Sequence, residues 1–291
     1  MANKIAMIAR RFPGIANVLR RVLPLSLKRR IGAMMLERNP TGLTRAADGR
    51  LFQTIPDRVF LQVIYDGEFE PSLSNVIRNT LQSGDTAVDI GANFGWFATL
   101  MAQTAKRVIT YEPAFRMDGI LRENVALNDM TAIIDMRKKA VGAEPGTATF
   151  VIEGDPERES ALGYVTVGDV SAADDMNTEN VEIVCIGDDL AEFAGNIALI
   201  KLDAEGFEHY AIQGGGELFS NDNPPVLITE ANAGTLGRSG STREALCAEI
   251  AQYGYTLYGM TSEGVLYPDD GKAPALTCLP NRGRFVGRIT A

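Results

Sequence analysis

The sequence predicts an α/β fold: a doubly wound, mostly parallel sheet with helices on both faces and an antiparallel strand near the C-terminus. From residue 84 onward, short apolar segments alternate with helix-length segments, a pattern typical of parallel sheets. A glycine-rich turn at 91–95 follows the first apolar segment. Later apolar segments end in acidic residues, and ligands of such sheets bind beyond the carboxyl ends of the strands. These observations indicate a ligand-binding α/β domain.

The segment that organises the sheet is 86–97, with the sequence TAVDIGANFGWF. Its apolar first half predicts a strand over 86–90 that is buried on both faces, and a helix begins at about Trp96. Gly91 and Gly95 lack a Cβ, so the chain can turn sharply and the helix start can approach a ligand closely. The free N–H groups of that helix start would bind a polar ligand. An ordinary strand–turn–helix of another α/β protein is the alternative.

The glycine spacing distinguishes between nucleotide cofactors. The dinucleotide fingerprint is Gly-x-Gly-x-x-Gly, whereas this turn has only Gly91 and Gly95, preceded by Asp89. The turn is similar to the first motif of methyltransferases that use S-adenosylmethionine (SAM). That similarity implies that Asp89 lies beside the methionine ammonium of SAM, and that Gly91, Asn93 and Gly95 surround its methionine and ribose portion.

A second strand is predicted over 107–112, after a helix that ends near Lys106, and Pro113 closes it. Glu112 lies at the carboxyl end of this strand, about 20 residues beyond the glycine turn, where a carboxylate can accept hydrogen bonds from both ribose hydroxyls. We therefore predict that Glu112 binds the ribose of the cofactor. The alternative is a solvated acid at the end of a strand.

The middle of the chain continues the alternation. We predict a helix over 115–127, a turn at 140–142, and strands over 132–137, 146–152 and 181–186. The polar loop 153–180 is long enough to form a lid. Within it, Ser160 is predicted to contact the adenine or to cover the cofactor.

The segment 197–208, IALIKLDAEGFE, is the second informative part of the sequence. Its apolar strand leads to Asp203 and Glu205 before a turn at Gly206, and a helix then carries Glu208 and His209. Charged groups at the carboxyl end of a buried strand are costly unless they are solvated or functional, and this is where ligands bind. Capping of the next helix by Asp203 or Glu205 is the alternative.

The remaining elements complete one domain, 41–291. The strand predicted over 225–230 ends in another acid, Glu230, and is followed by a helix over 241–253 and strands over 255–260 and 276–289. Before the sheet, short strands or loop are expected over 41–60 and a helix over 72–81.

The composition excludes several classes of protein. A net charge of -9 over 291 residues argues against a general nucleic-acid binder. Three scattered cysteines fit neither a disulfide framework nor a zinc site, and a single histidine rules out a histidine-built metal centre. Apolar runs long enough to span a membrane are absent from the sequence. We therefore expect a cytoplasmic protein.

The charge is unevenly distributed. Residues 1–36 contain eight Lys or Arg and no acid, so residues 37–291 contain 20 basic and 37 acidic residues, a net charge of -17. The basic residues alternate with apolar ones, as in helices that lie on anionic membranes. The segment 1–40 is therefore predicted to be an amphipathic extension. Peripheral membrane contact, packing on the acidic body and a homo-oligomer contact are its three alternatives.

Taken together, the motifs resemble the FkbM family of SAM-dependent methyltransferases over about residues 80–232. The motifs that carry the resemblance are VDIGANFG (88–95), YEP (111–113), Asn124 with Asn128, AVG (140–142), IKLDAEGFE (200–208) and ITE (228–230). Ala204 stands where the family often has valine, which leaves the neighbouring carboxylates in place. The resemblance implies a Rossmann-like class I methyltransferase sheet, SAM as cofactor, and methyl transfer to a hydroxyl of a sugar or secondary metabolite.

An alcohol nucleophile benefits from a general base. We predict that Asp203, Glu205 or His209 accepts the proton, the carboxylates first, and that Glu230 positions the acceptor, a small molecule or glycan. Asp203, Glu205 and Glu230 could also hold Mg²⁺ through oxygen ligands, but no spacing requires it, so no metal is predicted.

Two other functions stay open. An NAD(P)-dependent oxidoreductase on the same fold would need a third glycine in the turn, which is absent. A non-catalytic binding module, recruited to membranes through residues 1–36, would need a degenerate pocket, and the intact turn with Glu112 disfavours it.

Overall fold

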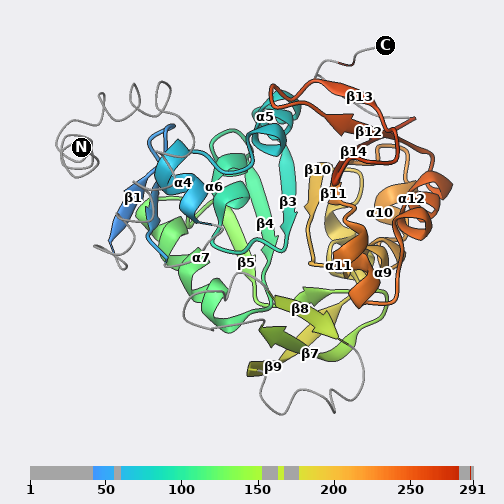
Figure 1. Cartoon of the computed structure of the whole chain (residues 1–291), viewed down its shortest axis with the longest axis horizontal. Helices are drawn as coiled ribbons and strands as arrows, with labels where there is room; N and C mark the ends of the chain where they lie inside the picture. The colour runs from blue at the N-terminus through green and yellow to red at the C-terminus, as the bar shows by residue number, and fades with distance from the viewer. Residues whose placement is uncertain (1–41, 56–59, 153–162, 167–176, 282–288, 290–291) are drawn as a thin grey trace.

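The structure is a computed structural model that describes all residues except 1–41, 56–59, 153–162, 167–176, 282–288 and 290–291. Its centre is an eight-stranded sheet in the order β13-β12-β14-β11-β10-β3-β4-β5 (Figure 1). The strands are β3 (Thr86–Ile90), β4 (Arg107–Tyr111), β5 (Ile134–Arg137), β10 (Ile197–Leu202), β11 (Val226–Glu230), β12 (Tyr255–Met260), β13 (Leu266–Pro268) and β14 (Ala275–Pro280).

The strand directions confirm the predicted sheet. The strands β5, β4, β3, β10 and β11 are parallel neighbours. β14 lies antiparallel between β11 and β12, and β13 is antiparallel to β12. β13 was not predicted, because its three residues are too few for an alternating pattern. The last predicted strand, over 276–289, corresponds to β14, and most residues after Pro280 lie outside the described part of the chain.

Helices cover both faces of the sheet, as predicted. Successive residues of β3 point into two different hydrophobic cores, Ala87 into the first and Val88 into the second. The first core includes residues of α5 (Pro71–Thr80), α6 (Trp96–Ala102) and α7 (Phe115–Leu127). The second includes residues of α9 (Glu208–Gln213), α10 (Glu217–Ser220), α11 (Ala233–Arg238) and α12 (Arg243–Gln252). Figure 1 shows α6 and α7 on one side of the sheet and α9 and α12 on the other. This is a doubly wound arrangement.

A second sheet corrects the prediction of a single one. Its order is β6-β9-β7-β8, with β6 (Ala140–Val141), β7 (Gly146–Ile152), β8 (Gly163–Thr166) and β9 (Asn177–Val184). The strand predicted over 181–186 belongs to this sheet and ends at Val184. Ile186 begins the short helix α8 (Ile186–Asp189), and η1 (Ala191–Phe193) follows it. Ala140 and Val141, predicted as a turn, pair with β9. Apolar alternation predicts that a strand exists, but it does not predict which sheet the strand joins.

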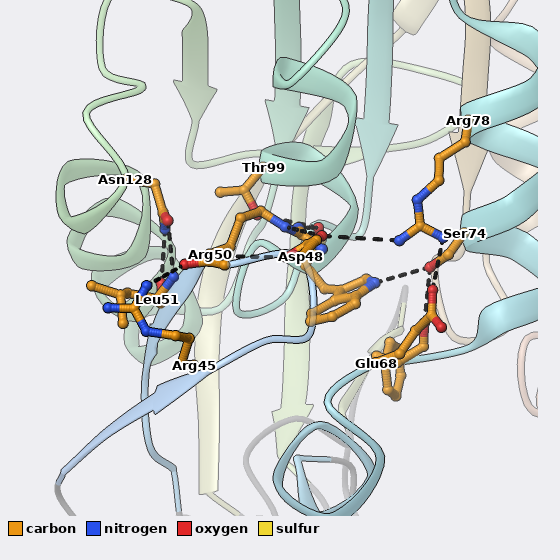
Figure 2. A network of polar contacts seen from close by, with 12 residues as sticks. Arg45, Asp48, Arg50, Leu51, Glu68, Ser74, Arg78, Thr99 and Asn128 are labelled. Carbon is orange, nitrogen blue, oxygen red and sulfur yellow. Dashed lines mark hydrogen bonds and ion pairs between the residues drawn. The ribbon is translucent and has the colours of Figure 1, made fainter. Parts of the chain in front are cut away.

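The lead-in to the domain is anchored by a buried arginine. β1 (Leu43–Arg45) and β2 (Leu51–Gln53) form a hairpin, which confirms the short strands, and α4 (Leu61–Asp66) follows. Arg50 donates hydrogen bonds to the Trp96 carbonyl (2.6 Å) and to Thr99 Oγ1 (2.7 Å), and its guanidinium lies 4.2 Å from the centre of the Trp96 ring (Figure 2). The hairpin therefore fixes the first turn of α6, next to the glycine turn.

Two asparagines of α7 make a second connection. Asn124 accepts a hydrogen bond from the Gln53 N–H (2.7 Å) and donates one to the Phe94 carbonyl (2.7 Å). Asn128 bonds both backbone groups of Leu51, and the Asn128–Leu51 pair is visible in Figure 2. These side chains tie the hairpin and the glycine turn to one helix.

None of the helices in the described part of the chain is long and apolar enough to cross a membrane. The predicted amphipathic extension, residues 1–40, lies within the segment 1–41, outside the described residues. Its predicted membrane or oligomer contacts, and the cytoplasmic location, therefore stay predictions.

Candidate functional site

The strand order of the central sheet reverses at β3, and this point can bind a ligand. The chain proceeds from β3 to β4 and β5 on one side, whereas β10 lies on the other side of β3. Ligands of open α/β sheets bind outside the carboxyl ends of the strands at this point. A cavity lies there, lined by residues of the turn after β3, by the ends of β4, β10 and β11, and by Phe150, Gly163 and Val165 of the second sheet.

Position 91 requires glycine for a structural reason that was not predicted. Its φ is +72°, and a Cβ built on it would lie 1.7 Å from the Asp203 carbonyl oxygen. The turn is therefore packed directly against the residue that follows β10. Gly91 still lines the cavity, through its backbone.

Gly95 packs against α7. Its φ is +87°, and a Cβ there would lie 2.6 Å from Leu121 Cδ1 of that helix. Gly95 is not among the residues that line the cavity, and its predicted contact with the cofactor stays a prediction.

Glu112 lies where it was predicted, at the edge of the cavity just after β4. It is 5% exposed. Its Oε2 accepts the N–H of Asn93 (2.8 Å), a cavity residue with φ +52°, and its Oε1 accepts the N–H of Ala114 (2.9 Å). Burial raises the pKa of Glu112 to about 7, although both backbone N–H groups oppose that shift. Each oxygen keeps a second lone pair, so the carboxylate can also accept hydrogen bonds from a ligand.

Asp89 is not where the resemblance implied. It is 0% exposed and absent from the cavity lining. Its Oδ1 lies 3.4 Å from Nζ of Lys201, its partner across the β3–β10 pair. Burial raises the pKa of Asp89, against the effect of the nearby ammonium. Because Asp89 belongs to β3 and not to the turn after it, its side chain lies against one face of the sheet. The Lys201 ammonium takes the position beside it that was predicted for a ligand ammonium.

Lys201 is the link between this buried acid and the cavity, which it lines. Its ammonium also lies 3.4 Å from Asp203 Oδ2 and donates a hydrogen bond to the Gly91 carbonyl (3.0 Å). Burial lowers the pKa of Lys201, but Asp203, Asp89 and Glu70 together raise it by more. The lysine is thus a charged cross-link between β3 and β10.

Three predicted acids do meet at the cavity: Asp203, Glu205 and Glu230 all line it. Glu205 has φ +51°, a conformation that costs about 1–3 kcal/mol for residues other than glycine and is common at functional sites. Burial, and then the charge of Asp203, raise the pKa of Glu205 and of Glu230 to about 8. These acids lie close enough to raise one another's pKa, so a cation bound among them would favour their ionised forms.

Glu70 is a fourth acid, which the sequence analysis missed as a site residue. It precedes α5, has φ +42°, and lines the same cavity. Burial and the charge of Asp203 raise its pKa to about 7. No signal in the sequence placed this residue near β10, because the contact joins segments that are far apart in the chain.

A second cavity adjoins the first and shares four residues with it: Glu70, Lys201, Asp203 and Glu230. Its other walls come from the start of α5 and from the strands near the C-terminus, with Met260 and Tyr267 among the lining residues. Two ligands could therefore meet across this group of charged side chains.

Two predicted site residues do not join the group. His209 lies outside both cavity linings, and its Nδ1 is 2.7 Å from Ser241 Oγ. The reason is helical geometry: Glu208 is directed inward, and a residue one step along a helix points about 100° away. Ser160 lies in 153–162, outside the described residues.

Comparison with known proteins identifies the family. The Methyltransferase FkbM domain matches residues 89–257, more than half of the chain and further toward the C-terminus than the expected 80–232. None of the curated proteins compared matches this chain.

Several solved structures resemble this chain, with low sequence identity. The methyltransferase FkbM from Methylobacillus flagellatus KT is 15% identical with a TM-score of 0.44, and the match covers 87% of this chain but only 59% of that one. A Streptococcus mutans protein assigned as a methyltransferase and solved with SAH is 9% identical (TM-score 0.41, covering 73% and 99%). An rRNA methylase from Streptococcus thermophilus is 8% identical (TM-score 0.40, covering 71% and 91%). The domain match, on a doubly wound sheet, is what assigns this chain: it belongs to the FkbM family of methyltransferases.

Proposed function

We propose that this protein transfers the methyl group of SAM to a hydroxyl oxygen of a small molecule or glycan. The observation that carries the proposal is the Glu112 carboxylate, buried at the end of β4 and lining the cavity of an FkbM-family domain. A carboxylate at the end of the second strand is suited to the two hydroxyls of a ribose. The turn beside it lacks the third glycine of a dinucleotide site.

The charge of the cavity supports a cationic cofactor. Glu70, Asp203, Glu205 and Glu230 line it together with Lys201, and a sulfonium carries a positive charge that such carboxylates stabilise. When bound, SAM would supply the methyl group and the leaving group. Gly91, Asn93 and Glu112 would hold it from the β3–β4 side.

The acceptor would enter through the second cavity, because that cavity meets the first at Glu70, Asp203 and Glu230. A wall of carboxylates repels phosphate groups, which supports a neutral hydroxylated acceptor over a nucleic acid. Alignment of the acceptor oxygen with the methyl group is the main task of the site, and well-oriented reactants can gain about 7–11 kcal/mol.

We place the general base at Glu205 first and at Asp203 next. Glu205 lines only the first cavity, in a strained turn that holds its carboxylate there. Glu230 accepts a hydrogen bond from Thr235 (3.3 Å) and would position the acceptor. His209 has no part in the proposal.

Calorimetric titration with SAM, S-adenosylhomocysteine and NAD⁺ tests the cofactor. We expect the first two to bind and Glu112→Gln to weaken them about 10- to 100-fold, because a hydrogen bond to a charged group contributes about 1.5–3 kcal/mol. Gln keeps the size of the side chain, and the midpoint of thermal unfolding shows whether the variant is folded. Binding of NAD⁺ alone would overturn the proposal in favour of an oxidoreductase.

The same binding should depend on pH. With its pKa at about 7, Glu112 is mostly ionised at pH 8 and mostly protonated at pH 6, and only the ionised form makes the stronger, charge-assisted bonds. Affinity should therefore fall about tenfold between pH 8 and pH 6, because a tenth of the protein is then competent. Glu112→Gln should lose this part of the pH dependence; an identical slope in the variant would contradict the assignment.

The base is tested once a screen of sugars and hydroxylated metabolites has yielded an acceptor. Glu205→Gln should lower kcat about 10²- to 10⁴-fold while the affinity for SAM stays within a few-fold. His209→Gln is the control and should retain turnover. Full activity in both Glu205→Gln and Asp203→Asn would remove these carboxylates from the chemistry.

A further inference from the structure

Three carboxylates converge at the carboxyl end of β10. One oxygen each from Asp203, Glu208 and Glu230 can be chosen so that all three lie within 4.8 Å of one another. Two of the residues follow neighbouring parallel strands: Leu202 of β10 pairs with Thr229 of β11, so Asp203 and Glu230 leave the sheet side by side. Glu208 reaches them from the first turn of α9. Three like charges at this spacing repel one another.

The second observation is the burial of the Glu208 carboxylate, which the proposed methyl transfer does not explain. Its side chain is 0% exposed. Oε1 accepts hydrogen bonds from the N–H groups of Ala204 (2.7 Å) and Gly206 (3.1 Å), which fixes the carboxylate at the turn. Among the described residues, Oε2 is buried with no hydrogen-bond partner. A buried oxygen without a partner is costly, and a bound cation would satisfy it.

The nearby lysine does not meet this need. The Lys201 ammonium is 3.4 Å from Asp203 Oδ2 and 3.4 Å from Asp89 Oδ1, and it donates to the backbone carbonyl of Gly91. Of the three acids, Lys201 therefore forms an ion pair with Asp203. Neither Glu208 nor Glu230 is among the ion-pair or hydrogen-bond partners of this ammonium within the described residues.

We propose that Asp203, Glu208 and Glu230 bind a hard divalent cation, such as Mg²⁺ or Mn²⁺, through carboxylate oxygens. Such ions prefer oxygen ligands and keep water in the remaining positions. The site lies at the junction of the two cavities, which Asp203 and Glu230 both line. An acceptor hydroxyl that replaced one water would be oriented and made more acidic. Glu205 is outside the group and stays available to take the proton.

Cation binding itself does not depend on the proposed function, whereas the role toward an acceptor hydroxyl does. The test is titration of the chelator-treated full-length protein with Mn²⁺, followed by electron paramagnetic resonance of the free ion, and with Mg²⁺ by calorimetry. We expect one Mn²⁺ per chain. Glu208→Gln and Glu230→Gln should each weaken Mn²⁺ binding at least about tenfold. Mutation of a residue that only hydrogen-bonds to a metal ligand already lowers metal affinity about 10–100-fold.

Glu205→Gln is the matched control, because it removes one carboxylate of the same turn from outside the group. Circular dichroism verifies that each variant is folded. No saturable Mn²⁺ binding, or equal weakening in Glu205→Gln and Glu208→Gln, would overturn the proposal. SAM is titrated into the same samples: SAM binding without Mn²⁺ binding refutes only the cation site, and Mn²⁺ binding without SAM binding refutes only the proposed cofactor.

Discussion

Replacement of Gly91 by alanine is expected to destabilise the protein by about 2–5 kcal/mol and to abolish cofactor binding. The left-handed conformation at φ +72° costs an alanine about 1–2 kcal/mol. The new methyl group would also lie 1.7 Å from the Asp203 carbonyl oxygen, and crowding of this kind costs about 1–3 kcal/mol. Relief requires the turn to move away from β10, which displaces Asp203.

Urea unfolding followed by circular dichroism measures the first effect, and SAM titration measures the second. Gly119→Ala is the control: Gly119 is exposed within α7, and a Cβ there would contact nothing within 4 Å. Alanine in that helix should be neutral or stabilising by up to about 1 kcal/mol. Equal stability of the Gly91→Ala and Gly119→Ala variants would contradict the close packing of the turn against the residue that follows β10.

Replacement of Lys201 by methionine is expected to cost about 3–5 kcal/mol of stability. Lys201 and Asp89 are 2% and 0% exposed, and their charged atoms are 3.4 Å apart. Removal of one member of a buried ion pair leaves the other charge without compensation, and losses of about 3–5 kcal/mol are typical. Methionine keeps the apolar stem, so the loss reports on charge rather than on packing.

A double-mutant cycle separates this effect from general damage to the sheet. Asp89→Asn alone should cost less, because Lys201 keeps Asp203 at 3.4 Å. The double variant Asp89→Asn, Lys201→Met should recover part of the loss of the single lysine variant, since no uncompensated carboxylate then remains at position 89. Simple additivity of the two single losses would show that the pair is not coupled.

The central architecture could be predicted from the sequence, because the signals for its strands and helices are local. The strands of the β3–β10 region are short apolar runs bounded by glycine or acid, and α7 was predicted with the bounds that the structure has. Such runs suffice for a parallel sheet, since both of its faces are buried. The position of Glu112 could also be predicted, because it depends only on one strand–turn–helix–strand unit.

Local signals failed wherever a residue's environment comes from a distant segment. Asp89 was expected beside the cofactor, yet its side chain is fully buried and paired with Lys201. The contact between Gly95 and Leu121 of α7 also joins two separate segments of the chain. The second sheet and the role of Glu70 were missed for the same reason.

The doubly wound sheet, the turn after β3 and the acids at the strand ends could thus be predicted from the sequence, because hydrophobic period and glycine spacing are properties of neighbouring residues. The folded structure was needed to show which acids face the cavity, which are buried, and which converge into one group. Register between β3, β10 and β11, together with the direction of each side chain from α5 and α9, sets those distances, and both depend on packing between segments far apart in the chain.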